Sequence, residues 1–141
     1  MKNIFSKREK TALFLLFSLF LLIFLLYFLG WLVLLPFADN LLHFLGGFFV
    51  ALFFIDYFRR ALIAERSLSK DLLIVIGASL LVGVGWEIFE FILSYISLPN
   101  ITLFRSGGLF DTLKDLVIDS IGAMAMFFVI RHRHRQSELF R

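Results

Sequence analysis

The sequence contains no cysteine and only two prolines, and charged residues make up just 18% of its 141 positions. The absence of cysteine excludes disulfides, thiolate metal sites and cysteine nucleophiles. Soluble domains carry about 25% charged and about 45–50% apolar residues, whereas 60% of this chain is hydrophobic and its mean hydropathy is +0.92. A chain this short cannot hide so much apolar surface from water. The composition therefore argues against a soluble enzyme and against disorder, and indicates one membrane domain over residues 1–141.

Long apolar runs are what the sequence does have. A membrane-spanning helix needs about 20 apolar residues, and the uncharged run from Ala12 to Leu35 holds 24. It is longer than the apolar part of a secretory signal, and no A-x-A-like cleavage site follows it, so we interpret it as a retained helix. Three further stretches follow. We predict an all-α polytopic membrane protein, a four-helix transmembrane bundle with helices at about 12–35, 39–63, 71–96 and 109–130.

The basic residues predict the orientation of these helices. Twelve of the 14 lysines and arginines lie in the N-terminal segment, the second loop or the C-terminal tail, and only Arg105 and Lys114 lie on the opposite side. Positive charge marks the cytoplasmic side, so both termini should be cytoplasmic. We interpret the Arg and His tail at 131–135 as an anchor to acidic lipid. The expected partners are membrane lipid and further copies of this chain, and not nucleic acid.

Ionisable residues inside the spans are the main functional signal. A charged group is costly in hydrocarbon, so it normally faces a cavity or a partner. Counting from the basic boundaries at about 1.5 Å per residue puts His43, Glu87 and Asp115 at nearly one height, in the outer half of the bilayer. Within each helix the residues recur every three or four positions, and therefore share one face. The three sets are Asp39 with His43, Glu87 with Glu90, and Asp111 with Asp115 and Asp119.

These polar faces should meet around a pocket. Glycine permits close approach of membrane helices, and the same faces carry Gly46, Gly47, Gly83 and Gly122. So many carboxylates cannot all be ionised together at low dielectric. The carboxylates in the pocket must therefore take up protons, bind a cation or be neutralised by basic residues near the opening of the pocket.

Three kinds of function are compatible with this pocket. One is a divalent cation site, for which oxygen ligands with one imidazole favour Mg²⁺, Mn²⁺ or Ca²⁺, with Zn²⁺ conceivable. The second is a proton- or ion-coupled transporter. It needs a homo-oligomer, because four helices alone enclose only a narrow pathway across the membrane. The third is a structural network that only fixes helix packing. We favour a pocket that binds or processes a cell-envelope amphiphile or polar headgroup with a divalent cation, and the sequence assigns no enzyme class.

Each ionisable residue receives an expected role. Acid/base roles are assigned to His43 and Glu87. Substrate contacts are assigned to Asp39, Glu90, Arg105, Asp111 and Lys114, and cation ligation to His43, Glu87, Glu90, Asp115 and Asp119. If the side chains of His43, Glu87 and Asp115 lay more than ~10 Å apart, they could not share one cation at ligand distances of about 2–2.6 Å.

Three motifs within residues 36–130 carry a resemblance to a known family. They are Asp39-x-x-x-His43-Phe44, Trp86-Glu87-x-x-Glu90-Phe91, and Asp111-Thr112-x-x-Asp115-Leu116 followed by Gly122-Ala123. Together they resemble the VanZ-like superfamily, and most closely its YjdF-type branch. The resemblance implies a multi-pass protein of the bacterial plasma membrane. Founding VanZ members are associated with resistance to teicoplanin-type glycopeptides, but they usually carry Gln and Asn where this chain has Glu90 and Asp119. The wider family brings no settled activity.

Overall fold

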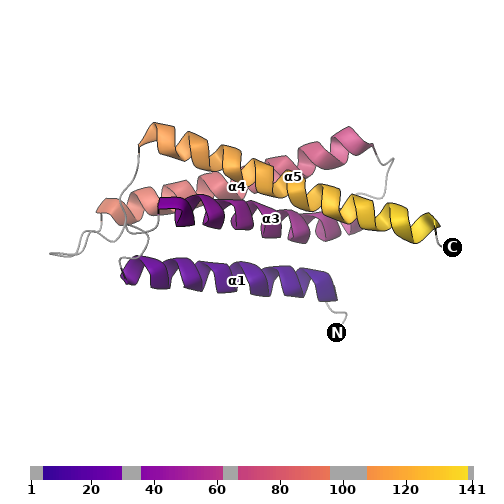
Figure 1. The fold of residues 1–141 in the computed structure, drawn as a ribbon, viewed down its shortest axis with the longest axis horizontal. Coiled ribbons are helices and arrows are strands. Elements are labelled where there is room, and N and C mark those ends of the chain that lie inside the picture. Colours follow the sequence, from indigo (N-terminus) through magenta and orange to yellow (C-terminus); the bar gives the residue numbers. More distant parts are fainter. Residues whose placement is uncertain (1–4, 30–35, 62–66, 96–107, 140–141) are drawn as a thin grey trace.

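The described part of the chain forms four helices. The computed structural model describes residues 5–29, 36–61, 67–95 and 108–139, and the regular structure in these ranges is all α-helix. Successive helices run in alternating directions, so the first turn of α1 and the last turn of α5 lie at the same end of the bundle (Figure 1). We call this the termini end and the opposite one the site end. The helices are α1 (Lys7–Phe28), α3 (Pro36–Ala61), α4 (Leu68–Tyr95) and α5 (Leu109–Leu139).

A capping box sets the start of α1. The Ser6 hydroxyl accepts a hydrogen bond from the Glu9 amide at 3.1 Å, and the Glu9 carboxylate accepts one from the Ser6 amide at 2.8 Å. This reciprocal pair satisfies two amides at the helix N-terminus that have no partner within the helix. The helix therefore begins at Lys7, before the apolar run that we expected to start it at Ala12.

The other helices also extend beyond their apolar spans. Proline, which suits the first position of a helix, begins α3 at Pro36, and α4 begins at Leu68. Gly108 precedes α5 with a φ of 82°, a conformation that favours glycine, and its carbonyl accepts hydrogen bonds from the first turn. At its C-terminal end, α5 continues past the expected boundary to Leu139. The expected ends at residues 35, 63 and 96 lie outside the described residues.

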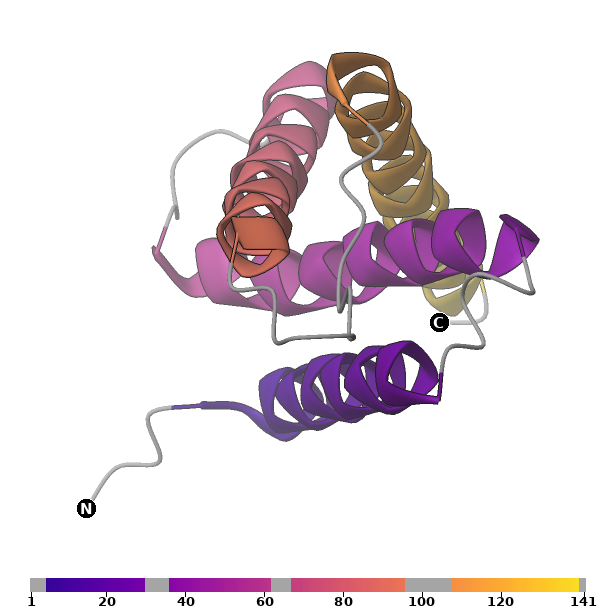
Figure 2. The ribbon, with the colours of Figure 1, turned by 90° about the vertical axis from the view of Figure 1, so that its left-hand side faces the viewer.

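Helix α3 is the centre of the bundle. It packs against α1, α4 and α5, while α1 approaches the backbone of no other described helix. Figure 2 shows α4 and α5 on one side of α3 and α1 on the other. Toward the termini end most buried side chains are apolar, with Glu9 in the first turn of α1 as a buried charged exception. The main cluster of buried side chains comprises Ala51, Ile55, Val75, Ala123, Met126, Phe127 and Ile130.

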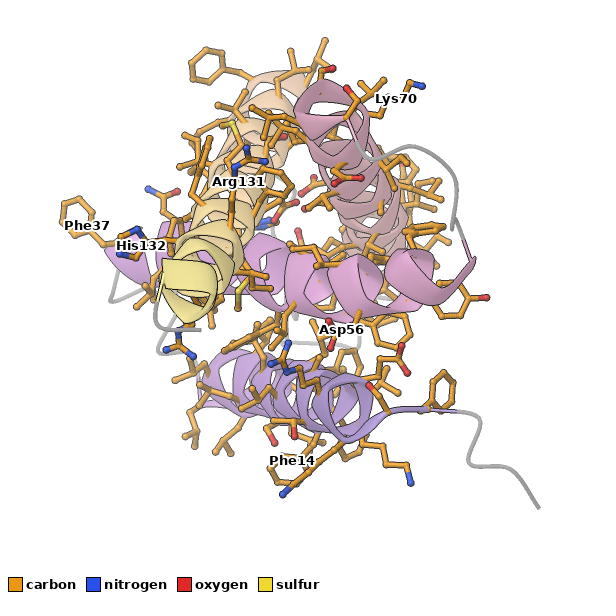
Figure 3. All side chains as sticks on the ribbon, turned by 90° about the vertical axis from the view of Figure 1, so that its right-hand side faces the viewer. Phe14, Phe37, Asp56, Lys70, Arg131 and His132 are labelled. Carbon is orange, nitrogen blue, oxygen red and sulfur yellow. The ribbon has the colours of Figure 1, made fainter. Side chains whose placement is uncertain are left out.

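The outer surface is that of a membrane protein. Three helical segments are long and apolar enough to cross a bilayer, namely Lys7–Leu26, Phe37–Phe58 and Leu68–Tyr95. Large apolar side chains point outward, among them Phe14 and Phe37 (Figure 3). Of the described helices, only α5 does not contain a segment apolar enough to cross a bilayer by composition, because it carries acidic residues on its inner face. Its outer face is apolar, with exposed Leu109, Phe110, Leu113, Val117, Ile121 and Phe128.

Candidate functional site

His43 lies at the centre of a cluster formed by three helices near the site end. The residue is only 6% exposed. Its Nε2 atom lies 3.8 Å from Asp39 Oδ1, 3.9 Å from Glu87 Oε1 and 3.9 Å from Asp115 Oδ2. Its Nδ1 atom lies 3.4 Å from Asp119 Oδ1. The His43 cluster, meaning these five residues, thus surrounds one imidazole with four carboxylates.

The two ring nitrogens of His43 have different environments. Nδ1 faces the single carboxylate of Asp119, which is 5% exposed. The backbone carbonyl of Asp119 accepts a hydrogen bond of 3.3 Å from the buried hydroxyl of Ser79 on α4. Nε2 instead faces three carboxylates that lie farther toward the site end. The inner side of the ring therefore faces Asp119, whose backbone is bonded to Ser79, and its outer side faces the other three carboxylates.

Three glycines allow the helices to meet at this depth. A side chain at Gly47 would collide with the backbone of Asp119, one at Gly83 with the Asp119 carboxylate, and one at Gly122 with the backbone carbonyl of Phe44. Helices α3, α4 and α5 therefore come together around Asp119 in a way that only glycine permits. The close approach brings the carboxylates of α4 and α5 within reach of His43 on α3.

Two neighbouring donors fix the acidic groups. Thr112 on α5 donates a hydrogen bond of 2.7 Å to Glu87 Oε2 on α4. The ammonium of Lys114 lies 2.7 Å from Asp111 Oδ1, 3.2 Å from Asp115 Oδ1 and 3.7 Å from Asp39 Oδ2. Lys114 is the only cation other than His43 that pairs with these carboxylates among the described residues, so the acidic charge exceeds the basic charge that faces it.

A cavity of about 180 Å³ opens beside the His43 cluster. Asp39, His43 and Glu90 form its polar end, and Glu90 is held by a hydrogen bond of 3.0 Å from the Trp86 indole. Helix α1 supplies much of the remaining wall with four apolar side chains. They are Leu16, Leu19, Phe20 and Ile23.

The structure brings together most of the residues that the sequence singled out. His43, Glu87 and Asp115 are in mutual reach, and Asp39 and Asp119 complete the cluster. Glu90 lies beside it on the cavity, and Asp111 lies toward the outside with Lys114. Arg105 lies outside the described residues. The roles assigned to all of these residues remain predictions.

Sequence reasoning missed the neutral polar residues that support the cluster. Ser79 was overlooked, although it precedes Gly83 and Glu87 at four-residue spacing, which places all three on one face of α4. Trp86 was noticed only as part of a motif, although Glu90 lies four residues later, within reach of its indole. Thr112 likewise received no role beyond its place in a motif, and the structure shows it as a hydrogen-bond donor to Glu87.

The cluster has the donor chemistry of a cation site. One atom each from Asp39, His43 and Asp115 lies within 4.8 Å of the others. Glu87 Oε1 is buried and accepts no hydrogen bond in the described part of the chain, and the buried Asp115 Oδ1 faces the Lys114 ammonium at 3.2 Å. Carboxylate oxygens with one imidazole nitrogen suit Mg²⁺ or Mn²⁺ better than softer metals. A divalent cation would satisfy these oxygens and balance the excess of negative charge.

A helical membrane protein with a buried His and acidic cluster is therefore the class that the fold and the site define. The family described as "Predicted membrane protein (DUF2238)" matches residues 4–136, and the chain belongs to this family. A Thermotoga maritima protein named "Uncharacterized protein" is 30% identical over 132 residues, which cover 94% of this chain and 67% of the relative. No solved structure matches the chain.

Proposed function

We propose that the chain crosses the bacterial plasma membrane four times, with both termini in the cytoplasm. The apolar outer face of α5 supports a fourth span, because its acidic residues point into the bundle instead of toward lipid. The shared position of the first turn of α1 and the last turn of α5 supports an even number of crossings (Figure 1). The excess of basic residues at that end supports a cytoplasmic location. The VanZ-like, YjdF-type resemblance of the three motifs supports the same placement.

The His43 cluster, in this proposal, binds a divalent cation. Asp39, Glu87, Asp115 and His43 Nε2 supply the ligands. A histidine that ligates a metal usually donates its other N–H to a carboxylate or carbonyl, which fixes the ring. The position of Asp119 at Nδ1 fits that role, so we propose Asp119 as a positioning residue instead of the ligand suggested by the sequence.

The bound cation would recognise the polar headgroup of an envelope amphiphile. The observation that carries this proposal is the cavity, which joins a polar end at Asp39, His43 and Glu90 to an apolar wall from α1. An amphiphile needs both kinds of surface in the same cavity. A phosphate or carboxylate headgroup would contact the cation and Lys114, and the start of the apolar chain would lie along Leu19 and Phe20.

A coupled transporter is less well supported than a pocket open to one side. Polar side chains run from the exposed end of α5 inward to Asp119, and below them the buried cluster around Ala51 and Ala123 is apolar. Within the described residues this cluster lies between the site and the termini end. Labelling of an Asp119→Cys variant from one side only would support the pocket, and labelling from both sides would favour the transporter.

The cation is tested with Mn²⁺ as the probe, on purified protein in detergent, by paramagnetic resonance and calorimetry. We expect one Mn²⁺ per chain, and at least about a tenfold loss of affinity in Asp115→Asn. The control is Asp71→Asn, an equal charge change on the exposed first turn of α4, which should bind normally. Equal Mn²⁺ binding by both variants would contradict the cation site.

The headgroup is tested with dodecyl phosphate, a single-chain amphiphile. We expect Mn²⁺ to increase its binding to the wild type, and Leu19→Trp, which fills the cavity, to reduce dodecyl phosphate binding while Mn²⁺ binding is kept. Leu21→Trp is the matched control, since Leu21 is exposed and does not line the cavity. Unchanged dodecyl phosphate binding in a folded Leu19→Trp protein would refute the amphiphile pocket and leave the cation site standing.

A further inference from the structure

A second cavity lies at the termini end, away from the His43 cluster. Its volume is about 800 Å³, within the range of about 300–1,000 Å³ that is usual for ligand pockets. Three helices form it, because α1 packs on α3 but leaves a space toward α5. Its apolar wall is made by Leu15, Phe48, Phe49, Leu52, Met126, Val129 and Ile130.

Basic side chains border the same cavity. Lys7 and Arg8 come from the first turn of α1, and Arg133 comes from the last part of α5. Arg8 lies 3.8 Å from Asp56 on α3, whereas neither Lys7 nor Arg133 forms an ion pair with a carboxylate in the described part of the chain. Among the described residues that line the cavity, none is acidic. Figure 3 views this end and shows Asp56 between α3 and α1, and Arg131 and His132 on α5.

We propose that this cavity binds one acidic phospholipid. The acyl chain would lie against the apolar wall, and the phosphate would lie between Lys7 and Arg133. The argument rests on charge complementarity joined to an apolar cavity, because a basic rim alone would attract any anion and an apolar cavity alone would accept any lipid. A lipid that fills the space between α1 and α5 would also add to the contacts that α1 makes with α3 and, through Phe20, with Trp86 and Phe89 of α4.

The basic rim is tested with two double variants of equal charge. Lys7→Gln with Arg133→Gln removes cations that line the cavity. Lys10→Gln with Arg131→Gln removes exposed cations from the same two helices at the same end, and neither of these lines the cavity. Binding of phosphatidylglycerol and of phosphatidylcholine with identical chains is measured by native mass spectrometry of the full chain in detergent.

The expected results follow from the place of each cation. A basic residue near an anionic headgroup contributes roughly a fivefold change in affinity, so the lining pair should contribute roughly 30-fold. We expect phosphatidylglycerol to bind the wild type more tightly than phosphatidylcholine and to lose about that factor in the first double variant only. Equal losses in both double variants, or equal binding of the two lipids by the wild type, would overturn the proposal.

A further pair of variants separates a lipid from a free anion. Val129→Trp places a ring in the cavity from a partly exposed position, and Phe128→Trp changes the neighbouring exposed residue that does not line it. Only Val129→Trp should weaken phosphatidylglycerol binding, with the melting temperature of both variants as a check of folding. If inorganic phosphate at low millimolar concentration displaced the lipid fully, the apolar wall would play no part and the proposal would fail. Asp115→Asn, a change in the His43 cluster, should leave phosphatidylglycerol binding unchanged. The lipid proposal can therefore fail while the proposed function holds, and the reverse.

Discussion

Adding one methyl group at Gly47 should destabilise the protein, whereas adding one at the adjacent Gly46 should not. A Cβ at Gly47 would lie 2.7 Å from the carbonyl carbon of Asp119 and 2.8 Å from its Cα, both of which belong to the backbone of α5. Because backbone atoms cannot rotate away, α3 and α5 would have to move apart at this contact. A Cβ at Gly46 would meet only Asp119 Oδ1, at an ordinary 3.9 Å.

The magnitude follows from two opposed effects. Replacing glycine by alanine within a helix stabilises by roughly 0.5–1 kcal/mol, because glycine loses more conformational freedom on folding. Overpacking of a close contact costs about 1–3 kcal/mol. Gly46→Ala should therefore raise the free energy of unfolding. Gly47→Ala has the same gain but also overpacks the contact, so it should lower the free energy of unfolding, and the two variants should differ by the overpacking cost of roughly 1–3 kcal/mol.

The comparison is made by unfolding both variants in mixed detergent micelles, with intrinsic tryptophan fluorescence as the signal. Gly77→Ala on α4 is a second control, since nothing lies within 4 Å of a Cβ built there. If Gly47→Ala were as stable as Gly46→Ala and Gly77→Ala, the close packing of α3 on α5 at Asp119 would be refuted. Mn²⁺ binding to Gly47→Ala should fall as well, because the same separation moves Asp119 away from His43.

Three further substitutions test individual contacts. Lys114→Met should raise Mn²⁺ affinity about tenfold in calorimetry, because the ammonium lies 3.2 Å from Asp115 Oδ1 and competes with a cation there; unchanged or weaker binding would contradict this. Thr112→Val should lower the free energy of unfolding by about 1–3 kcal/mol, because it leaves Glu87 Oε2 without its donor; equal stability would show that this hydrogen bond is unimportant. Ser6→Ala should cost about 1 kcal/mol and speed hydrogen exchange in the first turn of α1, and an unchanged exchange rate would argue against the capping box.

Hydropathy predicted the helices but misplaced where they begin. An apolar run marks the part of a helix that meets lipid, and a helix starts where its first amides find acceptors. The Ser6 and Glu9 capping box lies in the charged segment before Ala12, so a search for uncharged residues passes over it. The serine, the glutamate three residues later and the following apolar run would have identified Lys7 as the first helical residue.

The cluster was predictable because helical spacing and depth are both readable in the sequence. Counting residues from the basic boundary was enough to place His43, Glu87 and Asp115 at one level, since each helix rises by a fixed amount per residue. The orientation of the His43 ring could not be predicted from the sequence. That Nδ1 of His43 faces Asp119 while Nε2 faces the other carboxylates depends on how close α3 comes to α5, and that distance is set by Gly47 and Gly122.

Helix α1 connects the two cavities although its apolar part carries no charge. Its first half, through Lys7, Thr11 and Leu15, borders the cavity toward α5 at the termini end. Its second half, through Leu16, Leu19 and Ile23, borders the cavity beside the His43 cluster. Both cavities exist because, among the described helices, the backbone of α1 comes close to that of α3 alone, while its contact with α4 is made by side chains such as Phe20. A shift of α1 along α3 would therefore alter both cavities together, so a lipid bound between α1 and α5 would also fix the apolar wall that an amphiphile meets beside His43.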